Sequence, residues 1–140
     1  MEHFIIKLHA GFAYLSLILL IYALANTFLA KNANREFTAK DRKIALFALI
    51  FAHCQLLIGL VTYFVSPLGK AVFGQMANAD FRLTSLEHPL VNIVAIILIT
   101  IGWSKHKKTN ISAEKFQKIF VFYGLGLILI LSRIPWKLWF

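Results

Sequence analysis

Two apolar stretches decide the fold of this chain: HAGFAYLSLILL, residues 9–20, and HPLVNIVAIILITIGW, residues 88–103. Each opens with a histidine and continues as an apolar run. Such runs belong to segments of roughly 20 apolar residues, the length at which a helix crosses the hydrocarbon core of a bilayer. An ionisable side chain at the edge of such a helix is costly unless something binds it, so the two histidines mark a candidate site.

The composition is that of a membrane protein. Of the 140 residues, 59% are hydrophobic and 15% are charged, whereas soluble domains have about 45–50% apolar and about 25% charged residues. The net charge of +9 does not indicate a nucleic-acid partner, because the basic residues gather in short loops between apolar segments. A single cysteine, Cys54, excludes an internal disulfide and CxxC redox chemistry.

The hydropathy pattern predicts an all-α protein, one domain of residues 1–140 that forms a four-transmembrane-helix bundle. Pro67 is expected to close the second helix and Pro135 the fourth, since proline cannot continue a helix. The expected helices cover about residues 4–30, 44–65, 86–103 and 119–136.

The distribution of basic residues predicts the orientation. Residues 31–43 and residues 104–118 carry five basic residues each, ten of the fifteen in the chain, whereas residues 66–85 carry only Lys70 and Arg82. The positive-inside rule places the first two of these segments in the cytoplasm, which puts both termini outside (N-out/C-out). The two helices that begin near a histidine then enter the membrane from the same side.

His9 and His88 are the candidate metal ligands. They lie about five and two residues inside their helices, so at 1.5 Å per residue their depths differ by roughly 5 Å. Two neutral imidazoles at one depth on neighbouring helices can bind a haem iron from both faces. The alternative is a pair of interfacial histidines that hydrogen-bond to lipid headgroups or to neighbouring backbone.

Small and polar residues surround this level of the membrane. Gly59 lies at nearly the depth of His9, and a porphyrin needs small residues on the helices that face it; small residues also allow plain helix packing. Gln55, one turn before Gly59, is expected to hydrogen-bond to a ligand or to another helix. Arg133, near the outer end of the fourth helix, is expected to pair with a haem propionate or, equally, with a lipid headgroup.

The other histidines are assigned differently. His53 lies near the middle of the second helix, roughly 10 Å deeper than His9 by helix rise. A hydrogen bond within the bundle is the favoured role for it; a quinone headgroup held together with Gln55, or iron ligation, are the alternatives. His3 and His106 fall in the aqueous flanks and are predicted to be solvated.

Several of these residues carry a resemblance to known families. The segments HAGFAY (9–14), QLLIGL (55–60) and HPLVNIVA (88–95) look like parts of one four-helix half of haem A synthase. More closely, the whole chain resembles a family of small bacterial four-helix membrane proteins called cytochrome B or cytochrome B-like. The segments that carry this second resemblance are DRKIALF (41–47), IGWSKHKK (101–108) and LSRIPW (131–136).

The resemblance implies a haem b between the outer ends of two helices of a bacterial inner-membrane protein, with His9 and His88 as ligands. Haem A synthase has a glutamate before its first-helix histidine and commonly an arginine after it, where this chain has Leu8 and Ala10. That difference, and the presence of only one half, argue against haem hydroxylation.

The function expected from the sequence is electron transfer by a b-type haem within a larger respiratory or biogenesis complex, with a quinone as a candidate partner. The alternative is a structural or assembly subunit of a membrane complex, whose histidines only hydrogen-bond. A stand-alone enzyme is the weakest of the three hypotheses. The membrane segments carry no paired carboxylates, nucleophile constellation or phosphate-binding loop.

Overall fold

A computed structural model describes residues 1–139 of the chain. These residues form a bundle of four long helices. The long helices are α1 (Glu2–Asn32), α2 (Ala39–Val65), α4 (His88–His106) and α5 (Ser112–Ser132), and the described residues contain no strand. All four helices are long and apolar enough to cross a membrane. The predictions of an all-α four-helix bundle and of a multi-pass membrane protein are confirmed.

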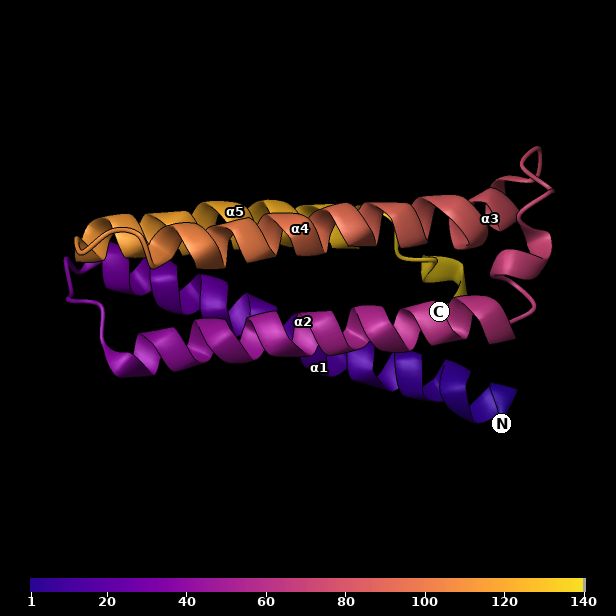
Figure 1. Cartoon of the computed structure of the whole chain (residues 1–140), viewed down its shortest axis with the longest axis horizontal. Helices are drawn as coiled ribbons and strands as arrows, with labels where there is room; N and C mark the ends of the chain where they lie inside the picture. Colours follow the sequence, from indigo (N-terminus) through magenta and orange to yellow (C-terminus); the bar gives the residue numbers. More distant parts are fainter. Residues whose placement is uncertain (140) are drawn as a thin grey trace.

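The helices form a square in which each packs on two neighbours. The extensive contacts join α1 to α2, α2 to α4, α4 to α5 and α5 back to α1, so α1 and α4 are diagonal partners, as are α2 and α5. Figure 1 shows the pair α4 and α5 above the pair α1 and α2. Both termini and the connection from α2 to α4 lie at one end, which we call the histidine end, and the two short loops lie at the other, the loop end (Figure 1).

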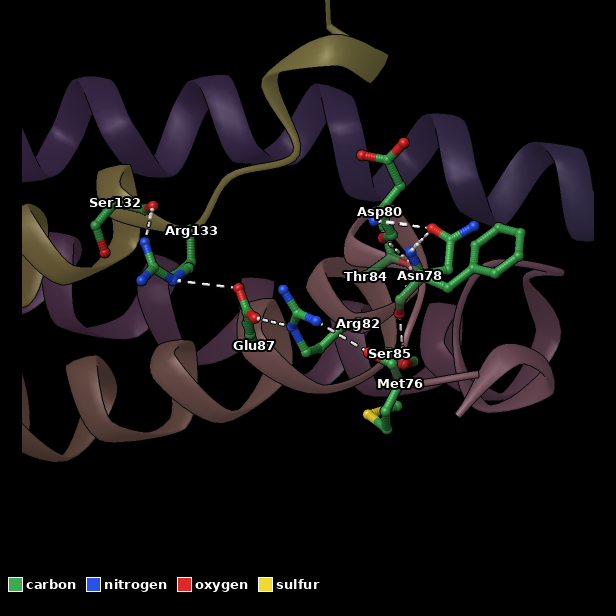
Figure 2. Close-up of polar contacts among 10 residues, drawn as sticks. Met76, Asn78, Asp80, Arg82, Thr84, Ser85, Glu87, Ser132 and Arg133 are labelled. Atoms are coloured by element: carbon green, nitrogen blue, oxygen red, sulfur yellow. Dashed lines mark hydrogen bonds and ion pairs between the residues drawn. The ribbon is translucent and has the colours of Figure 1, made fainter. Parts of the chain in front are cut away.

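The connection from α2 to α4 contains three short helical segments. These are η1 (Lys70–Val72), α3 (Ala79–Arg82) and η2 (Leu83–Glu87), a π-helical turn that runs directly into α4. Asn78 caps α3, because its side-chain oxygen accepts hydrogen bonds from the backbone N–H groups of Asp80 and Phe81 at 3.0 and 3.2 Å (Figure 2). The membrane-length helix that carries His88 therefore begins before His88 itself.

The hydrophobic core lies toward the loop end of the bundle. Tyr123 of α5 is completely buried there, and its hydroxyl donates a 2.9 Å hydrogen bond to the carbonyl oxygen of Ala45 on the diagonal helix α2. Small residues on α1 and α2 let the backbones approach closely, which is the usual basis of helix association in lipid. The buried members of this core are Leu20, Ala23, Ala45, Ala48, Ala52, Ile96, Ile99, Trp103, Ile119 and Tyr123.

A polar network fixes the first loop against the bundle. The Asp41 carboxylate, in the first turn of α2, is 3% exposed and accepts hydrogen bonds from the guanidinium of Arg35 at 2.7 and 2.8 Å. It also accepts from the Asn26 amide at 2.9 Å and from the backbone N–H of Thr38 at 2.8 Å. A buried carboxylate is tolerated when it is paired and hydrogen-bonded in this way, so the network anchors α1 to the start of α2.

The observed helix boundaries differ most from those expected at α5. It begins at Ser112 rather than at Ile119, and it ends at Ser132 rather than at Trp136. Pro135 has no N–H to donate, and its ring disfavours helical geometry at the preceding residue, so the helix stops before it. The residues after Ser132 turn back toward the bundle through η3 (Trp136–Leu138), and Trp139 packs on Tyr14 with ring centroids 4.7 Å apart.

Close packing of α4 on α5 makes a testable prediction. A Cβ atom at Gly126 would lie 2.7 Å from Cγ1 of Ile99 and 3.1 Å from the carbonyl oxygen of Ala95. We therefore expect Gly126→Leu to force the helices apart and to lower the free energy of unfolding by about 1–3 kcal/mol, as overpacking does. Gly11→Leu is the control, because nothing lies within 4 Å of its Cβ position. Thermal unfolding in detergent, followed by circular dichroism, measures both; equal midpoints for the two variants would contradict this packing.

Candidate functional site

A large cavity occupies the histidine end of the bundle. Its volume is about 450 Å³, within the range of roughly 300–1,000 Å³ that is usual for small-molecule sites. It extends inward between the helices as far as Leu20, Ala52 and Ile96, and its lining contains no Asp, Glu, Lys or Arg. Two histidines, Gln55 and Asn92 are among the few polar side chains that face this apolar space.

His9 and His88 meet in this cavity from diagonal helices. Their ring centroids are 6.2 Å apart and the ring planes are inclined at 75°. Two imidazoles on opposite sides of one metal ion have ring centres about 6 Å apart, because each metal–nitrogen bond is about 2 Å and each ring centre lies about 1 Å behind its nitrogen. The structure thus brings together the two residues that the sequence predicted as a pair.

His88 has the tautomer that metal ligation requires. Its Nδ1 lies 2.8 Å from the backbone carbonyl oxygen of Arg133, which can only accept, and 3.2 Å from the amide nitrogen of Asn92, which can only donate. The shorter contact, to the carbonyl oxygen, assigns the proton to Nδ1 and leaves Nε2 of the neutral ring unprotonated. A backbone carbonyl that holds the second ring nitrogen is the usual arrangement behind a ligating histidine. Asn92, one turn further along α4, donates to the His88 carbonyl oxygen at 2.6 Å and stiffens this turn.

His9 is held in the opposite tautomer by Gln55. The Gln55 amide nitrogen lies 3.0 Å from Nδ1 of His9 and 2.9 Å from the His9 carbonyl oxygen, so Nδ1 accepts and Nε2 is protonated. The amide oxygen of Gln55 is buried and has no hydrogen-bond partner among the described residues. A half-turn of the amide would let its oxygen accept from Nδ1–H and leave Nε2 of His9 free to bind a metal, at the cost of the hydrogen bond from the amide nitrogen to the His9 carbonyl oxygen.

Gly59 is the surface on which the His9 ring rests. A Cβ atom at Gly59 would lie 3.0 Å from Cε1 of His9, closer than most such contacts. Ala10 and Ala13 also line the cavity, whereas Gly11 does not and is exposed. A side chain at Gly59 would therefore displace the His9 ring, whereas a Cβ atom at Gly11 would meet nothing within 4 Å.

Arg133 contributes to the site by its backbone and not by its guanidinium. The side chain is about half exposed, and its Nε lies 3.4 Å from Oε1 of Glu87. Arg82 binds the other oxygen of the same carboxylate at 2.8 Å (Figure 2). The expected pairing of Arg133 with a haem propionate stays a prediction, and its present partner is an acidic residue beside His88.

The three remaining histidines do not line the cavity. His53 contacts the Leu49 carbonyl oxygen at 2.8 Å and the Thr100 hydroxyl at 3.2 Å, and it does not line the cavity; this is the favoured hydrogen bond within the bundle. His3 is exposed as predicted. The prediction for His106 was wrong: it is 1% exposed. Its ring packs on Trp103 of the same helix and on Phe37 of the first short loop, which lies against the end of α4.

The cavity wall from the C-terminal segment was not predicted. Ile134, Pro135, Leu138 and Trp139 line the cavity, although the fourth helix was expected to continue to residue 136. Pro135 was a usable signal, since a helix that stops early frees the following residues to fold back.

These residues fit a group that needs two axial imidazoles and an apolar enclosure. The ring separation, the preset tautomer of His88 and the uncharged lining all suit it, and Gln55 is the one residue that must rearrange. No group of three or more His, Cys, Asp or Glu side chains within residues 1–139 is placed to hold a metal ion by itself. Two protein ligands suffice where another group, such as the macrocycle of a haem, fills the remaining positions of the metal.

Comparisons with known proteins identify no relative. No protein-family model, curated protein or solved structure matches the chain. The fold identifies the class of the protein, an integral membrane protein with four membrane-length helices. A more specific function has to be inferred from the site.

The cavity predicts opposite effects of adding volume at two alanines. Ala13 lines the cavity, whereas Ala48 is fully buried in the packed core. We expect Ala13→Leu to fill empty space and raise the free energy of unfolding of the ligand-free protein by about 0.5–2 kcal/mol. Ala48→Leu should lower it by about 1–3 kcal/mol through overpacking. Thermal unfolding in detergent without added ligand compares them; destabilisation by both would show that the cavity is not open space.

Proposed function

We propose that this chain is a b-type haem protein of the bacterial inner membrane that transfers single electrons within a larger respiratory or biogenesis complex. The observation that carries the proposal is the pair of imidazoles from diagonal helices, with ring centres 6.2 Å apart in an apolar cavity. When bound, haem b supplies reversible one-electron chemistry, whose potential depends on axial ligands, burial and hydrogen bonding.

The residues of the chain have distinct roles in this proposal. His9 and His88 bind the metal, Gln55 and the Arg133 carbonyl hold the second nitrogen of each ring, and Gly59 leaves room for His9. The apolar lining limits the access of water, and this would help to set the redox potential of a bound haem. With the basic loops on the cytoplasmic side, the site lies near the outer surface of the membrane, where a quinone or a partner subunit has access.

The alternative is an assembly subunit whose histidines serve only as hydrogen-bonding groups. One observation favours it: each histidine already has a partner within the chain, Gln55 for His9 and the Arg133 carbonyl for His88. The two functions differ in a single measurable property, the binding of haem.

The deciding experiment is a dithionite-reduced minus oxidised absorption spectrum of the protein purified from haem-replete cells. We expect sharp b-type bands that are lost in His9→Ala and in His88→Ala, because each removes one of the two imidazoles that would hold the haem iron. His53→Ala is the matched control and should keep the bands, since His53 lies outside the cavity. A wild-type protein without bands would contradict the haem proposal and favour the assembly subunit.

Gly59 tests the same site without removing a ligand. In Gly59→Val the new side chain must displace the His9 ring, which it would approach to 3.0 Å or less at Cβ. We expect at least a severalfold loss of haem per protein, measured by the pyridine haemochrome assay. Gly11→Val, on the exposed side of α1, should bind as much haem as the wild type. Equal haem content in the two variants would place the site elsewhere.

A further inference from the structure

The end of α5 supplies the hydrogen bond that fixes His88. The helix stops at Ser132 because Pro135 follows, and the last carbonyl groups of a helix have no partner within it. The side chain of Trp136 donates to the Leu131 carbonyl oxygen at 3.2 Å, and Arg133 Nη1 donates to that of Ser132 at 2.8 Å. The next carbonyl, that of Arg133, accepts from His88 Nδ1.

A carboxylate next to His88 holds the same residue from the other side. Oε1 of Glu87 pairs with Arg133, while Oε2 pairs with Arg82, whose Nη1 also donates to the Met76 carbonyl oxygen at 3.0 Å. Figure 2 shows Glu87 between the two guanidinium groups. Two consecutive residues, Glu87 and His88, therefore bind the side chain and the backbone of Arg133.

The π-helical turn makes this arrangement possible. In an α-helix, side chains three or four residues apart are neighbours, and those five apart are not. Arg82 and Glu87 are five apart, and they meet because residues Leu83–Glu87 form a π-helical turn, in which the spacing of five is the hydrogen-bonded one. Such turns are frequent at functional sites, and this one lies directly before a cavity histidine.

We propose that Glu87 is a positioning residue for His88. Through its ion pair it holds Arg133 so that the Arg133 carbonyl accepts from Nδ1–H, which keeps the ligating nitrogen Nε2 unprotonated toward the cavity. This inference rests on the proposed haem site for its purpose, but the tautomer of His88 is a property of the chain itself. The three residues also tie the C-terminal segment, whose side chains close the cavity mouth, to the helix that carries the ligand.

The test measures the His88 tautomer in the full-length chain without haem. Histidine labelled with ¹⁵N is followed by two-bond ¹H–¹⁵N correlation at a pH of about 8, above the ordinary histidine pKa of about 6.5, so that the rings are neutral. The His88 signals are those lost in His88→Gln. We expect the Nδ1–H form in the wild type, and a severalfold rise of the Nε2–H form in Glu87→Ala.

Two further variants keep this experiment decisive. Arg133→Ala should give the same change as Glu87→Ala, because it removes the other half of the ion pair but retains the carbonyl group. Asp80→Asn is the matched control: it breaks an exposed ion pair with Lys137 in the same C-terminal segment, 3.3 Å long, and should leave the tautomer unchanged. Circular dichroism and gel filtration confirm that each variant is folded.

The outcomes separate this inference from the haem proposal. A folded Glu87→Ala variant with the wild-type tautomer would overturn the positioning role, whether or not haem is bound. If the tautomer changes in Glu87→Ala while the wild-type protein binds no haem, the positioning role is supported and the haem proposal is defeated. Where haem is bound, Glu87→Ala should also shift its midpoint potential relative to Asp80→Asn, which a merely structural contact on the surface would not do.

Discussion

The bundle depends on an asymmetry between its two ends, set by how closely α4 can pack on α5 and α1 on α2. At the loop end, glycine and alanine bring the backbones together, and the buried Tyr123 hydroxyl joins α5 to α2 across the diagonal. In lipid, helices are held by packing and hydrogen bonds rather than by exclusion of water, so this closed end supplies most of the association. The histidine end is then free to stay open as a cavity.

The sequence predicted the parts of this structure that depend on local pattern. Apolar length located the four membrane helices, and the shared entry side of two of them placed His9 beside His88. The error at His106 had a different origin: a histidine among lysines looks solvated, and only its packing on Trp103 and on Phe37 of the first short loop buries it. The role of the Arg133 backbone was also beyond prediction, since a pattern of residues indicates side chains and not which carbonyl groups lack a partner.

The two cavity histidines are not equivalent. The acceptor for His88 is a backbone carbonyl, whose chemistry allows one tautomer only. The partner of His9 is an amide, which can donate or accept, and one of its ends is buried without a partner. The partner of His88 can therefore only accept, while the partner of His9 can donate or accept, and in the proposed haem complex the amide of Gln55 is the group that would have to turn.

The charges around the cavity follow from the same arrangement. No Asp, Glu, Lys or Arg within residues 1–139 lines the cavity, and the carboxylate of Glu87, the residue before His88, lies between two arginines. One negative charge between two positive ones leaves a net positive charge there, next to His88. An anionic edge of a bound group can be balanced at this position without entering the apolar interior, where an unpaired charge would cost several kcal/mol. In the proposed complex, the ion pair between Glu87 and Arg133 would therefore favour a ligand whose anionic end lies beside His88.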